Sequence, residues 1–390
     1  MRIVLCMPVD IDSLRDIIPD GEKMPHGYNW QMGGLLARCL RNTGCEVHIV
    51  TSSCHVSSTE VWRTNNLAIW ITPRRKKYLF TLDAYRIEVR EMRRAINLAN
   101  PDIVHAHWTY EFALAGLGSE YPCLITARDD PWVILLMTMS LYRLFRYCFA
   151  RYVIPRIKYL SFASPYMEEC YRSRYDLNAK KTFLIPNALP ESIFSQKPKT
   201  SDSAHSLTFA VTGDTGRLKN VAPIIRAFSR IKDTVPDCKF IFMGQGLDED
   251  CKLAHMASQL DVKKNMRFLG RVTHKNLLRI LEKEADILIH PSLEESFGMT
   301  VLEAMAKGLP VIGGSESGAV PWLLDYGKAG KLADVTSPLR IGEAMHEMLT
   351  DEDIRKQLSE RAWKRAHEEF NFNAISKIYI ETYEQILRFS

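Results

Sequence analysis

The chain has 390 residues, 46% of them hydrophobic and 25% charged, with a formal net charge of +5. This length favours two domains over one, and the composition is ordinary for a globular protein. An apolar run of 18 residues is absent, the apolar start is too short for a secretory signal, and no nucleic-acid-binding motif is present. We therefore expect neither a membrane-spanning helix nor a nucleic-acid partner.

The nine cysteines are odd in number and show no CxxC or Cys/His metal spacing, which predicts reduced thiols and a cytoplasmic location. Cys6 and Cys238 lie in strand-like runs, where we expect them to fill core space. Charge is unevenly spread: residues 1–190 contain 24 Lys and Arg against 18 Asp and Glu, and residues 191–390 contain 27 against 28. The two halves are therefore expected to have different partners.

Short apolar runs alternate with helical patterns along the first half of the chain. They predict strands at 2–9, 46–52, 67–73, 102–108, 123–127, 159–164 and 182–186. Helical patterns occupy 33–44 and 85–100. A connection of more than 20 residues, 10–32, follows the first strand, and a connection of that length is uncommon unless it is functional. We interpret it as an acceptor-binding or lid loop, with candidate residues His26, Tyr28 and Trp30.

The second half repeats this alternation. It predicts strands at 207–213, 239–244, 266–270, 286–292 and 309–314, and helices at 220–232 and 277–285. Such a pattern indicates an α/β fold with parallel sheets covered by helices on both faces. Residues 186–206 are rich in Pro, Ser and Lys and predict an interdomain linker centred near residue 197. The predicted domains are 1–190 and 191–370, followed by a C-terminal helix at 371–390.

Three carboxylates stand out in the stretch HPSLEESFGMTVLEAMAKGLPVIGG, residues 290–314. Glu294 and Glu295 follow an apolar strand, and Glu303 lies in the helix that begins near Gly298. The start of that helix favours an anion such as a phosphate, and Glu303 is placed to accept hydrogen bonds from a ribose diol. The alternative is that Glu303 pairs with Lys307 at i,i+4 and that Glu295 is a first-turn carboxylate.

Two glycine-containing turns add to this site. VTGDTGRLKN at 211–220 follows a strand and opens a helix, and its Arg217 and Lys219 suit a diphosphate, although the Walker order is absent. A basic turn before an amphipathic helix is the alternative. Gly33 and Gly34 begin the first helix, either to approach a ligand or to allow tight packing.

Taken together, EESFGMTVLEAMAKGLPVIGG resembles the E-x7-E motif of family-4-type retaining glycosyltransferases (glycosyl transferases group 1). The resemblance extends over nearly the whole chain through the GG helix start, DIVHAHW, SPYMEE, IPNAL, GDTGRLKN, GQG and FLGRV. It implies the GT-B fold, in which two doubly wound Rossmann-like domains face each other across a cleft. The final helix would cross back to the N-terminal, acceptor-binding domain, and the C-terminal domain would bind the nucleotide sugar.

The resemblance also implies roles for individual residues. Glu303 would bind the ribose, Glu295 the donor sugar, and Lys219 the diphosphate, with Gly34 beneath it. The full implied donor-binding set is Gly34, Gly213, Val272, Phe297, Gly298, Met299, Thr300 and Glu303. The implied catalytic set is Glu295, Lys219, Arg217 and Arg128.

The sequence departs from the family pattern at two positions. Asp214 stands where the family usually has an arginine, and Arg217 is expected to substitute for it. Arg128 stands where a strand-end histidine is usual; it would bind a substrate carboxylate or phosphate, or form an internal salt bridge with Asp129 or Asp130. These two carboxylates in tandem are expected to be structural rather than a metal site.

The first half also supplies the candidates for acceptor and membrane contact. His105 and His107 either face the cleft or are satisfied strand-end histidines. The basic stretches 73–80 and 131–158 predict contact with an anionic membrane, whereas a core helix with snorkelling arginines is the alternative for 131–158. The acceptor-binding candidates are His26, Tyr28, Trp30 and His107.

The predicted function is retaining, metal-independent transfer from a nucleotide sugar, a UDP-sugar first and a GDP-sugar second. The acceptor would be a saccharide or lipid-linked saccharide in cell-surface polysaccharide or glycoconjugate synthesis, on the inner face of the membrane. A small-molecule glycosyltransferase of the same fold, such as a sugar-phosphate synthase, and a non-catalytic sugar-binding protein are the alternatives. A dehydrogenase would need GxGxxG after a strand, which GQGLDED does not provide.

Overall fold

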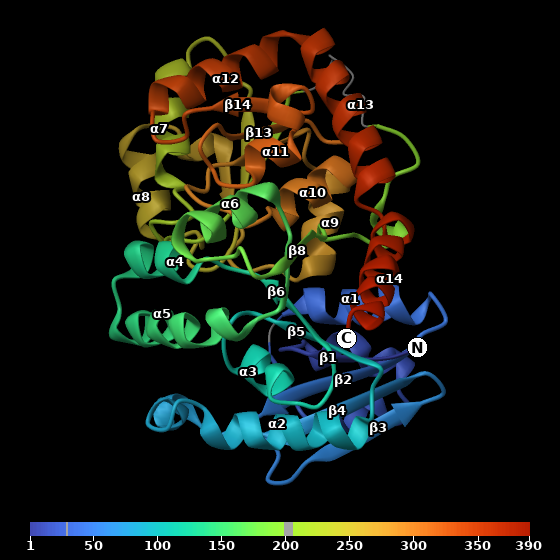
Figure 1. The fold of residues 1–390 in the computed structure, drawn as a ribbon. Coiled ribbons are helices and arrows are strands. Elements are labelled where there is room, and N and C mark those ends of the chain that lie inside the picture. The colour runs from blue at the N-terminus through green and yellow to red at the C-terminus, as the bar shows by residue number, and fades with distance from the viewer. Residues whose placement is uncertain (29, 199–205) are drawn as a thin grey trace. The chain divides into compact units, whose positions relative to one another are not determined.

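The computed structural model describes residues 1–28, 30–198 and 206–390. The chain forms two compact units: unit 1 comprises Met1–Ala188 and Phe372–Ser390, and unit 2 comprises Leu189–Asn371 (Figure 1). The predicted boundaries, 190 and 370, lie near these positions. Unit 2 begins at Leu189 rather than near residue 197, the predicted centre of the linker 186–206, and residues 199–205 of that linker lie outside the described part of the chain. Ser195 donates its backbone N–H to the carbonyl oxygen of Ala306 at 3.0 Å, so this segment is already attached to unit 2.

Unit 1 is built on an eight-stranded sheet in the order β3-β4-β2-β1-β5-β6-β7-β8. All neighbouring strands pair in parallel except β3 and β4, which are antiparallel. The strands are β1 Arg2–Cys6, β2 Glu46–Ser53, β3 Glu60–Thr64, β4 Leu67–Pro73, β5 Ile103–His107, β6 Cys123–Ala127, β7 Tyr159–Phe162 and β8 Lys181–Leu184. The sequence did not predict β3, an edge strand whose residues are half-buried or exposed and therefore form no apolar run.

The helices of unit 1 cover both faces of this sheet. They are α1 Gln31–Arg41, α2 Arg86–Ala99, α3 Glu111–Leu117, α4 Pro131–Thr138, α5 Leu141–Val153, α6 Pro165–Arg174 and α14 Phe372–Arg388. Successive residues of a strand point to opposite faces, so Val4 and Cys6 pack with α2, α3 and α5, whereas Ile3 and Leu5 pack with α1 and α14. Figure 1 shows these two layers on opposite sides of the sheet.

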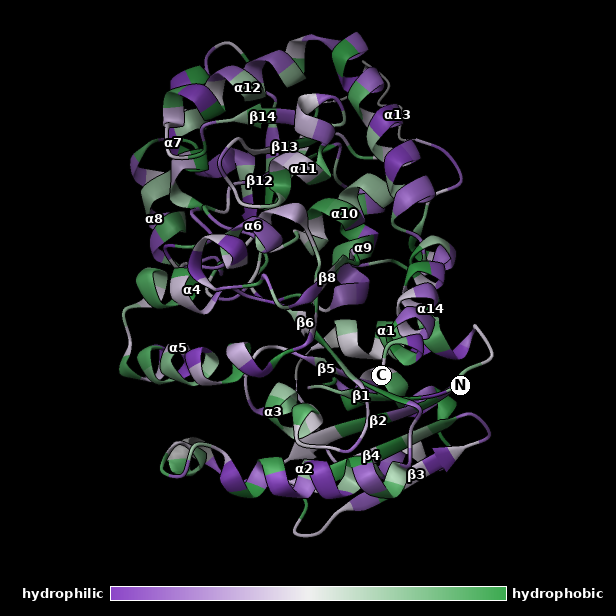
Figure 2. Cartoon of the chain, in the orientation of Figure 1, coloured by the Kyte–Doolittle hydropathy of each residue, from purple (hydrophilic) through white to green (hydrophobic). Residues whose placement is uncertain are grey.

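Helix α2 illustrates why these segments are helical. Its residues Val89, Met92, Ile96 and Ala99 recur at helical spacing and are buried, whereas Arg90 and Arg94 on the other side are exposed. Figure 2 shows the same helix as alternating hydrophobic and hydrophilic bands. Helix α2 therefore packs on the sheet through one apolar stripe of its own surface, as expected for a surface helix.

The connection 10–32 is packed rather than open. It contains the 3-10 helices η1 Ile11–Ile17 and η2 Gly21–Lys23, and it buries Leu14, Ile18 and Met24 in the core shared with α1. These apolar side chains hold most of the described part of this segment against the sheet, which disfavours a lid there, whereas acceptor binding by the segment stays a prediction.

Unit 2 has a six-stranded parallel sheet in the order β11-β10-β9-β12-β13-β14. Its strands are β9 Thr208–Thr212, β10 Lys239–Met243, β11 Met266–Phe268, β12 Ile287–His290, β13 Val311–Gly314 and β14 Lys331–Ala333. Its helices are α7 Ala222–Ile231, α8 Lys252–Gln259, α9 His274–Lys283, α10 Met299–Ala306, α11 Val320–Leu323, α12 Pro338–Thr350 and α13 Glu352–Glu369. In chain order the strands run 3-2-1-4-5-6, which is the doubly wound order.

The stretch 131–158 is two helices, α4 and α5, rather than one, because Met139 adopts a left-handed conformation at the end of α4 and Ser140 caps α5. All nine cysteines are free thiols, and Cys6 and Cys238 are buried in the core as predicted. Over the residues that the structure describes, no helix is long and apolar enough to cross a bilayer.

Candidate active site

In unit 2 the strand order reverses between β9 and β12, and ligands of doubly wound sheets bind outside the carboxyl ends of the strands at this point. The loops that follow these two strands are joined to each other. Leu293 donates its backbone N–H to the Leu218 carbonyl at 2.9 Å, and the Asn220 side-chain amide donates to the Pro291 carbonyl at 3.2 Å. The two motifs singled out in the sequence, 211–220 and 290–314, are therefore neighbours.

Glu295 is the centre of this site. Its Oε1 accepts a hydrogen bond from the Lys219 ammonium at 2.6 Å and lies 3.1 Å from Nε2 of His290. Among the residues with described positions, Oε2 of Glu295 receives no hydrogen bond. The carboxylate is thus held through one oxygen, and its second oxygen is left to accept from a ligand.

The protonation of Glu295 is decided by opposing effects. Burial raises the pKa of its carboxyl, but the hydrogen bond and charge of His290 and the charge of Lys219 lower it by more. The net pKa lies far below the usual range, so Glu295 stays ionised at neutral pH. His290 was not predicted as a site residue, although it ends the apolar strand in front of the motif.

The start of α10 lies directly after this carboxylate. Gly298 precedes the helix with a φ of +97°, a conformation that side chains with a Cβ rarely adopt. The first backbone N–H groups of a helix have no carbonyl partner within it and attract anions. Met299 and Thr300 in the first turn are half-buried, whereas the Phe297 ring is buried against Trp322 and Phe370. Phe297 can therefore contribute only its backbone to a ligand.

Glu303 is anchored in a similar way to Glu295. Its side chain is buried, and its Oε1 lies 2.7 Å from Nε2 of His274 at the start of α9. The alternative pairing with Lys307 is not observed, because Lys307 bonds Glu282 at 2.8 Å. The hydrogen bond to Glu303 outweighs burial and raises the pKa of His274. Across the described part of the chain, Oε2 of Glu303 receives no hydrogen bond, so this second carboxylate also has an oxygen left to accept.

The glycines of unit 2 bring the strand ends close together. A Cβ on Gly244, whose φ is +143°, would lie 1.6 Å from the carbonyl oxygen of Gly213. Gly213 donates its N–H to the Met243 carbonyl at 3.0 Å, which fixes the turn after β9. The remaining predicted residues of unit 2 differ in burial: Val272 is half-buried between β11 and α9, whereas Arg217 is exposed. Asp214 accepts a hydrogen bond from the Gly216 N–H at 2.7 Å and so shapes the turn.

In unit 1 the strand order reverses between β1 and β5, and Arg128 lies near this point, directly after β6. Its Nε donates to Nδ1 of His107 at 3.0 Å, its Nη1 donates to Oδ1 of Asn187, and its guanidinium carbon lies 5.6 Å from the centre of the Trp30 ring. Burial lowers the pKa of Arg128, with Tyr379 opposing the shift, yet the guanidinium remains charged.

The internal salt bridge proposed for Arg128 is not observed. Asp129 accepts from the Tyr110 hydroxyl at 3.2 Å, and Asp130 bonds Arg174 and the Trp132 backbone N–H. Within the described ranges, Arg128 has no ion pair with a carboxylate. This half-buried cation is therefore available to an anionic substrate group.

The two histidines of β5 have different environments. Both ring nitrogens of His105 are bonded, to Tyr383 and to Thr126 at 2.6 Å each, so His105 is a satisfied core residue. His107 accepts from Arg128 at Nδ1, which leaves the proton on Nε2, a buried atom without a hydrogen-bond partner. An unpaired buried donor is uncommon, so His107 remains a site candidate and His105 does not.

A pocket of 320 Å³ opens beside Trp30. It is lined by Pro8, Tyr28, Trp30, Arg74, Phe80, Tyr85, Trp108, Glu111, Phe112, Tyr142 and Arg146. Trp30 lies 4.7 Å from Trp108 between ring centroids, and the Tyr28 hydroxyl lies 3.1 Å from Ser52 Oγ. Burial raises the pKa of Tyr28 to about 12, against the opposing charge of Arg74, so its hydroxyl stays protonated. The charged groups of this pocket are Arg74, whose guanidinium carbon lies 4.2 Å from the centre of the Tyr28 ring, and a Glu111–Arg146 ion pair of 2.8 Å. We refer to it as the aromatic pocket.

Other predicted residues of unit 1 lie apart from the aromatic pocket. His26 has a side chain 73% exposed and does not line this pocket, so its acceptor contact stays a prediction. A Cβ on Gly34 would lie 2.1 Å from Ser13 Oγ, so tight packing by itself explains this glycine. Arg75 is held by Asp83 and Glu88, and Arg146 by Glu111, which removes both from the basic surface that the sequence suggested.

Two family models match adjacent parts of the chain. The model described as Glycosyltransferase Family 4 matches residues 35–192, and the model described as Glycosyl transferases group 1 matches residues 194–365. The first contains most of unit 1, and the second contains the carboxylates, lysine and histidines of the unit 2 site. Together they span most of the chain.

Similar proteins extend over nearly the full length. The N-acetyl-alpha-D-glucosaminyl L-malate synthase of Bacillus anthracis is 23% identical over 93% of this chain and 95% of its own. The solved sucrose-phosphate synthase of Thermosynechococcus elongatus aligns with a TM-score of 0.78 at 17% identity, with 100% of both chains covered. Anabaena HepE in complex with UDP-glucose aligns with a TM-score of 0.69 at 15% identity, covering 99% of this chain and 100% of that one. The chain therefore belongs to the family-4 glycosyltransferases, of the glycosyl transferases group 1 type, and is an enzyme with the GT-B fold.

Proposed function

We propose that the protein transfers a sugar, with retention of anomeric configuration, from a nucleotide-sugar donor held by unit 2 to a saccharide or lipid-linked saccharide acceptor held by unit 1. The observation that carries this proposal is the pair of carboxylates at the switch point of unit 2. Glu295 and Glu303 are each anchored through Oε1 by a histidine, and each has its Oε2 left to accept hydroxyl hydrogen bonds. A donor with a ribose and a hexose offers such hydroxyls at both ends.

Lys219 and the start of α10 would stabilise the departing diphosphate. Lys219 forms an ion pair with Glu295, and 31% of the lysine side chain is exposed. A diphosphate can therefore reach Lys219 and replace Glu295 as the partner of its ammonium group. Negative charge develops on the leaving phosphate as the bond to the anomeric carbon breaks, and preorganised cations and N–H groups stabilise that charge. The leaving phosphate oxygen would accept the proton of the attacking hydroxyl, so a dedicated base is not required. Arg217 would join these cations only by moving its exposed side chain to the phosphate.

UDP is the first nucleotide to test, because HepE was solved with UDP-glucose. The aromatic pocket in unit 1 would receive the acceptor sugar, with Tyr28, Trp30 and Arg128 around it. We further propose that the reaction needs no metal ion, that unit 1 contacts an anionic membrane, and that the enzyme acts in the cytoplasm in cell-surface polysaccharide synthesis. A transfer assay with EDTA in place of Mg²⁺ tests the first of these, because a metal-independent enzyme keeps its rate.

Thermal stabilisation by nucleotides is the direct test of the donor site. UDP, GDP and ADP are compared on the wild type, on Glu303→Ala and on Glu360→Ala, a matched control that removes an exposed carboxylate on α13. A ligand at about 100 times its dissociation constant stabilises the fold by roughly 2.7 kcal/mol. We expect a shift with one nucleotide that Glu360→Ala keeps and Glu303→Ala loses.

The outcomes test the nucleotide-sugar donor. No shift with any nucleotide, from well-folded wild type, would contradict a nucleotide-sugar donor held by Glu295 and Glu303. A shift that survives in Glu303→Ala would remove the ribose role of this residue. If transfer is then observed, the anomeric proton coupling of the product by NMR distinguishes retention from inversion.

A further inference from the structure

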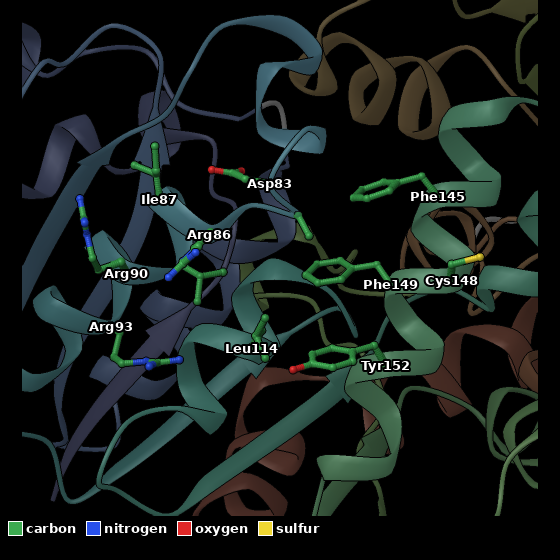
Figure 3. A pocket seen from close by; sticks show the side chains of 12 residues that line it. Asp83, Arg86, Ile87, Arg90, Arg93, Leu114, Phe145, Cys148, Phe149 and Tyr152 are labelled. Atoms are coloured by element: carbon green, nitrogen blue, oxygen red, sulfur yellow. The ribbon is translucent and has the colours of Figure 1, made fainter.

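A second, larger concavity in unit 1 plays no part in the reaction proposed above. It is a groove of 860 Å³, within the roughly 300–1,000 Å³ typical of small-molecule sites. It is lined by Asp83, Ala84, Arg86, Ile87, Val89, Arg90, Arg93, Leu114, Phe145, Cys148, Phe149 and Tyr152. Figure 3 shows Arg86, Arg90 and Arg93 of α2 on one side and Phe145, Phe149 and Tyr152 of α5 on the other. We call it the α2–α5 groove.

One wall of the groove carries three arginines, of which Arg90 has a carboxylate partner, Glu91 at 3.3 Å. Arg86, Arg90 and Arg93 are spaced i, i+4 and i+7, so they share one stripe of α2. The carboxylate that lines the groove, Asp83, is already paired with Arg75 at 2.7 Å. Among the side chains that the structure describes, Arg86 and Arg93 form no ion pair, and Nε of Arg93 is buried without a hydrogen-bond partner. This wall therefore suits a phosphate, which accepts hydrogen bonds from guanidinium groups.

The other wall of the groove is apolar. Leu114, Phe145 and Phe149 line it, and the groove is also lined by Ile87 and Tyr152, which are 40% and 52% exposed. Further exposed apolar side chains lie on α4, on α5 and on the segments that lead into α2 and α5: Leu79, Leu82, Leu136, Met139, Leu141 and Leu144. So many exposed apolar side chains on the helices that line the groove and on the segments next to them are typical of a binding surface.

The groove and the aromatic pocket share a wall. Tyr85 lines the aromatic pocket, and its ring stacks on Phe145 at 6.1 Å and on Phe149 at 5.7 Å, both of which line the groove. Arg146 of the aromatic pocket follows Phe145 on α5, and Asp83 and Ala84 of the groove precede Tyr85. A single acceptor molecule can therefore place its sugar in one concavity and its continuation in the other.

We propose that the α2–α5 groove holds the lipid anchor of the acceptor, with an apolar chain on the aromatic wall of α5 and a phosphate or diphosphate on the arginines of α2. The inference rests on the proposed function, because it names the acceptor class of the same enzyme. Charge complementarity selects this occupant: an uncharged chain would leave Arg86 and Arg93 without an anionic partner, and a free phosphate would leave the apolar wall uncovered. Phosphate and chain occur together in lipid-linked saccharides.

Cys148 gives a readout that does not depend on activity, because this exposed thiol lines the groove. Its alkylation rate by iodoacetamide, followed by mass spectrometry of its peptide, is measured with monomeric dodecyl phosphate, with dodecyl maltoside and without additive. At ten times its dissociation constant, a ligand leaves about one groove in eleven free, so dodecyl phosphate should slow alkylation about tenfold. Dodecyl maltoside should give little protection.

Two variants separate recognition of the phosphate from general apolar binding. Arg86→Gln/Arg90→Gln changes two exposed side chains of the groove, and the matched control Arg94→Gln changes an exposed arginine of α2 that does not line it. Protection by dodecyl phosphate should be lost in the double variant and kept in the control. Equal protection by both amphiphiles, or protection unchanged in the double variant, would overturn the proposal. Protection that rises with protein concentration alone would also overturn it, because it would identify a second copy of the chain as the occupant.

The nucleotide experiment on the same variants keeps the two proposals apart. Arg86→Gln/Arg90→Gln should retain thermal stabilisation by the donor nucleotide, while its KM for a lipid-linked acceptor rises about tenfold and its KM for the free saccharide stays unchanged. If nucleotides fail to stabilise the wild type although dodecyl phosphate protects Cys148, the nucleotide-sugar proposal fails and the groove remains an amphiphile site. If nucleotides bind and Cys148 is not protected, the donor site stands and the lipid anchor does not.

Discussion

The two units hold candidate sites at corresponding places in their sheets but build them from different chemistry. In unit 2 the switch point between β9 and β12 carries carboxylates, a lysine and two histidines, most of them within one stretch of 30 residues around the E-x7-E motif. In unit 1 the residues near the switch point are aromatic rings and arginines from many separate segments. The proposed donor site is therefore contained mostly in one local stretch of sequence, whereas the proposed acceptor pocket is lined by loops and helices from separate parts of unit 1.

The ion pairs of the two units differ in how far they are exposed to solvent. Lys219 is 31% exposed and its partner Glu295 has Oε2 unbonded in the described structure, so this pair can open to admit a ligand. Arg146 is only 12% exposed, stacks over the Tyr110 ring at 3.5 Å and bonds Glu111, itself 9% exposed. We interpret the first pair as part of the reaction and the second as part of the wall of the aromatic pocket.

Breaking the buried pair of unit 1 should have the largest effect. Glu111→Gln leaves Arg146 without its counter-charge, and removing one partner of a buried pair costs about 3–5 kcal/mol. Urea unfolding of the nucleotide-free protein measures this loss. The double variant Glu111→Gln/Arg146→Met should be less destabilised than the single variant, because no unpaired charge remains. Equal stability of Glu111→Gln and wild type would show that water reaches the pair, and the contrast with unit 2 would disappear.

Removing the lysine of unit 2 should affect catalysis next most strongly. Lys219→Ala deletes the cation that would meet the departing diphosphate, and loss of one such group lowers kcat about 10²–10³-fold. Lys232→Ala is the matched control, because this lysine of unit 2 forms a surface ion pair with Asp261 at 3.4 Å. The measurement is the steady-state kcat for sugar transfer of both variants, each compared with wild type. A fall of less than about tenfold in Lys219→Ala would assign the leaving-group role elsewhere, with Arg217 the next residue to test.

How much of this could be predicted from the sequence differs between the units. The periodicity predicted most strands and the parallel α/β class, and the spacing of Glu295 and Glu303 predicted a site at the start of α10. His274 and His290 were missed, because a histidine acquires its role here from carboxylates 29 and 5 positions away, contacts that only folding brings about. Arg128 was identified, but its partners His107 and Asn187 lie 21 and 59 positions away, so its bonds were not predictable.

Replacing the arginine of unit 1 should have an intermediate effect confined to the acceptor. Arg128→Lys keeps the charge but cannot donate to His107 and Asn187 with the same planar geometry. A hydrogen bond to a charged group contributes about 1.5–3 kcal/mol, so kcat/KM for the acceptor should fall roughly 10- to 100-fold. Stabilisation by the donor nucleotide should stay at the wild-type value. If nucleotide binding falls as well, Arg128 serves the donor, and the division of roles between the units would need revision.

The pH dependence of stability provides the smallest effect and tests the anchoring of Glu303. The pKa of His274 is raised in the folded chain by its hydrogen bond to Glu303, whereas an unfolded histidine titrates near about 6.5. Because the pKa of His274 is higher in the folded chain than in the unfolded chain, its interaction with Glu303 stabilises the fold fully below about pH 6.5. This stabilisation is lost as the pH rises through the pKa of His274 in the folded chain. Because His274 is 27% exposed, the pair contributes at most about 1 kcal/mol.

Melting temperatures of wild type and His274→Gln across pH 5.5 to 8.5 measure this contribution as a difference, which cancels the titration of the other histidines. Glutamine still offers an N–H to Glu303 but carries no charge, so the variant should be less stable than wild type at low pH and approach it at high pH. A difference that does not change with pH would mean that His274 anchors Glu303 as a neutral donor. Glu303 would then be held by a hydrogen bond from a neutral donor, without an ion pair, just as Arg128 of unit 1 donates to the neutral amide oxygen of Asn187. The electrostatic contrast between the two sites would in that case depend on the ion pair of Glu295 with Lys219.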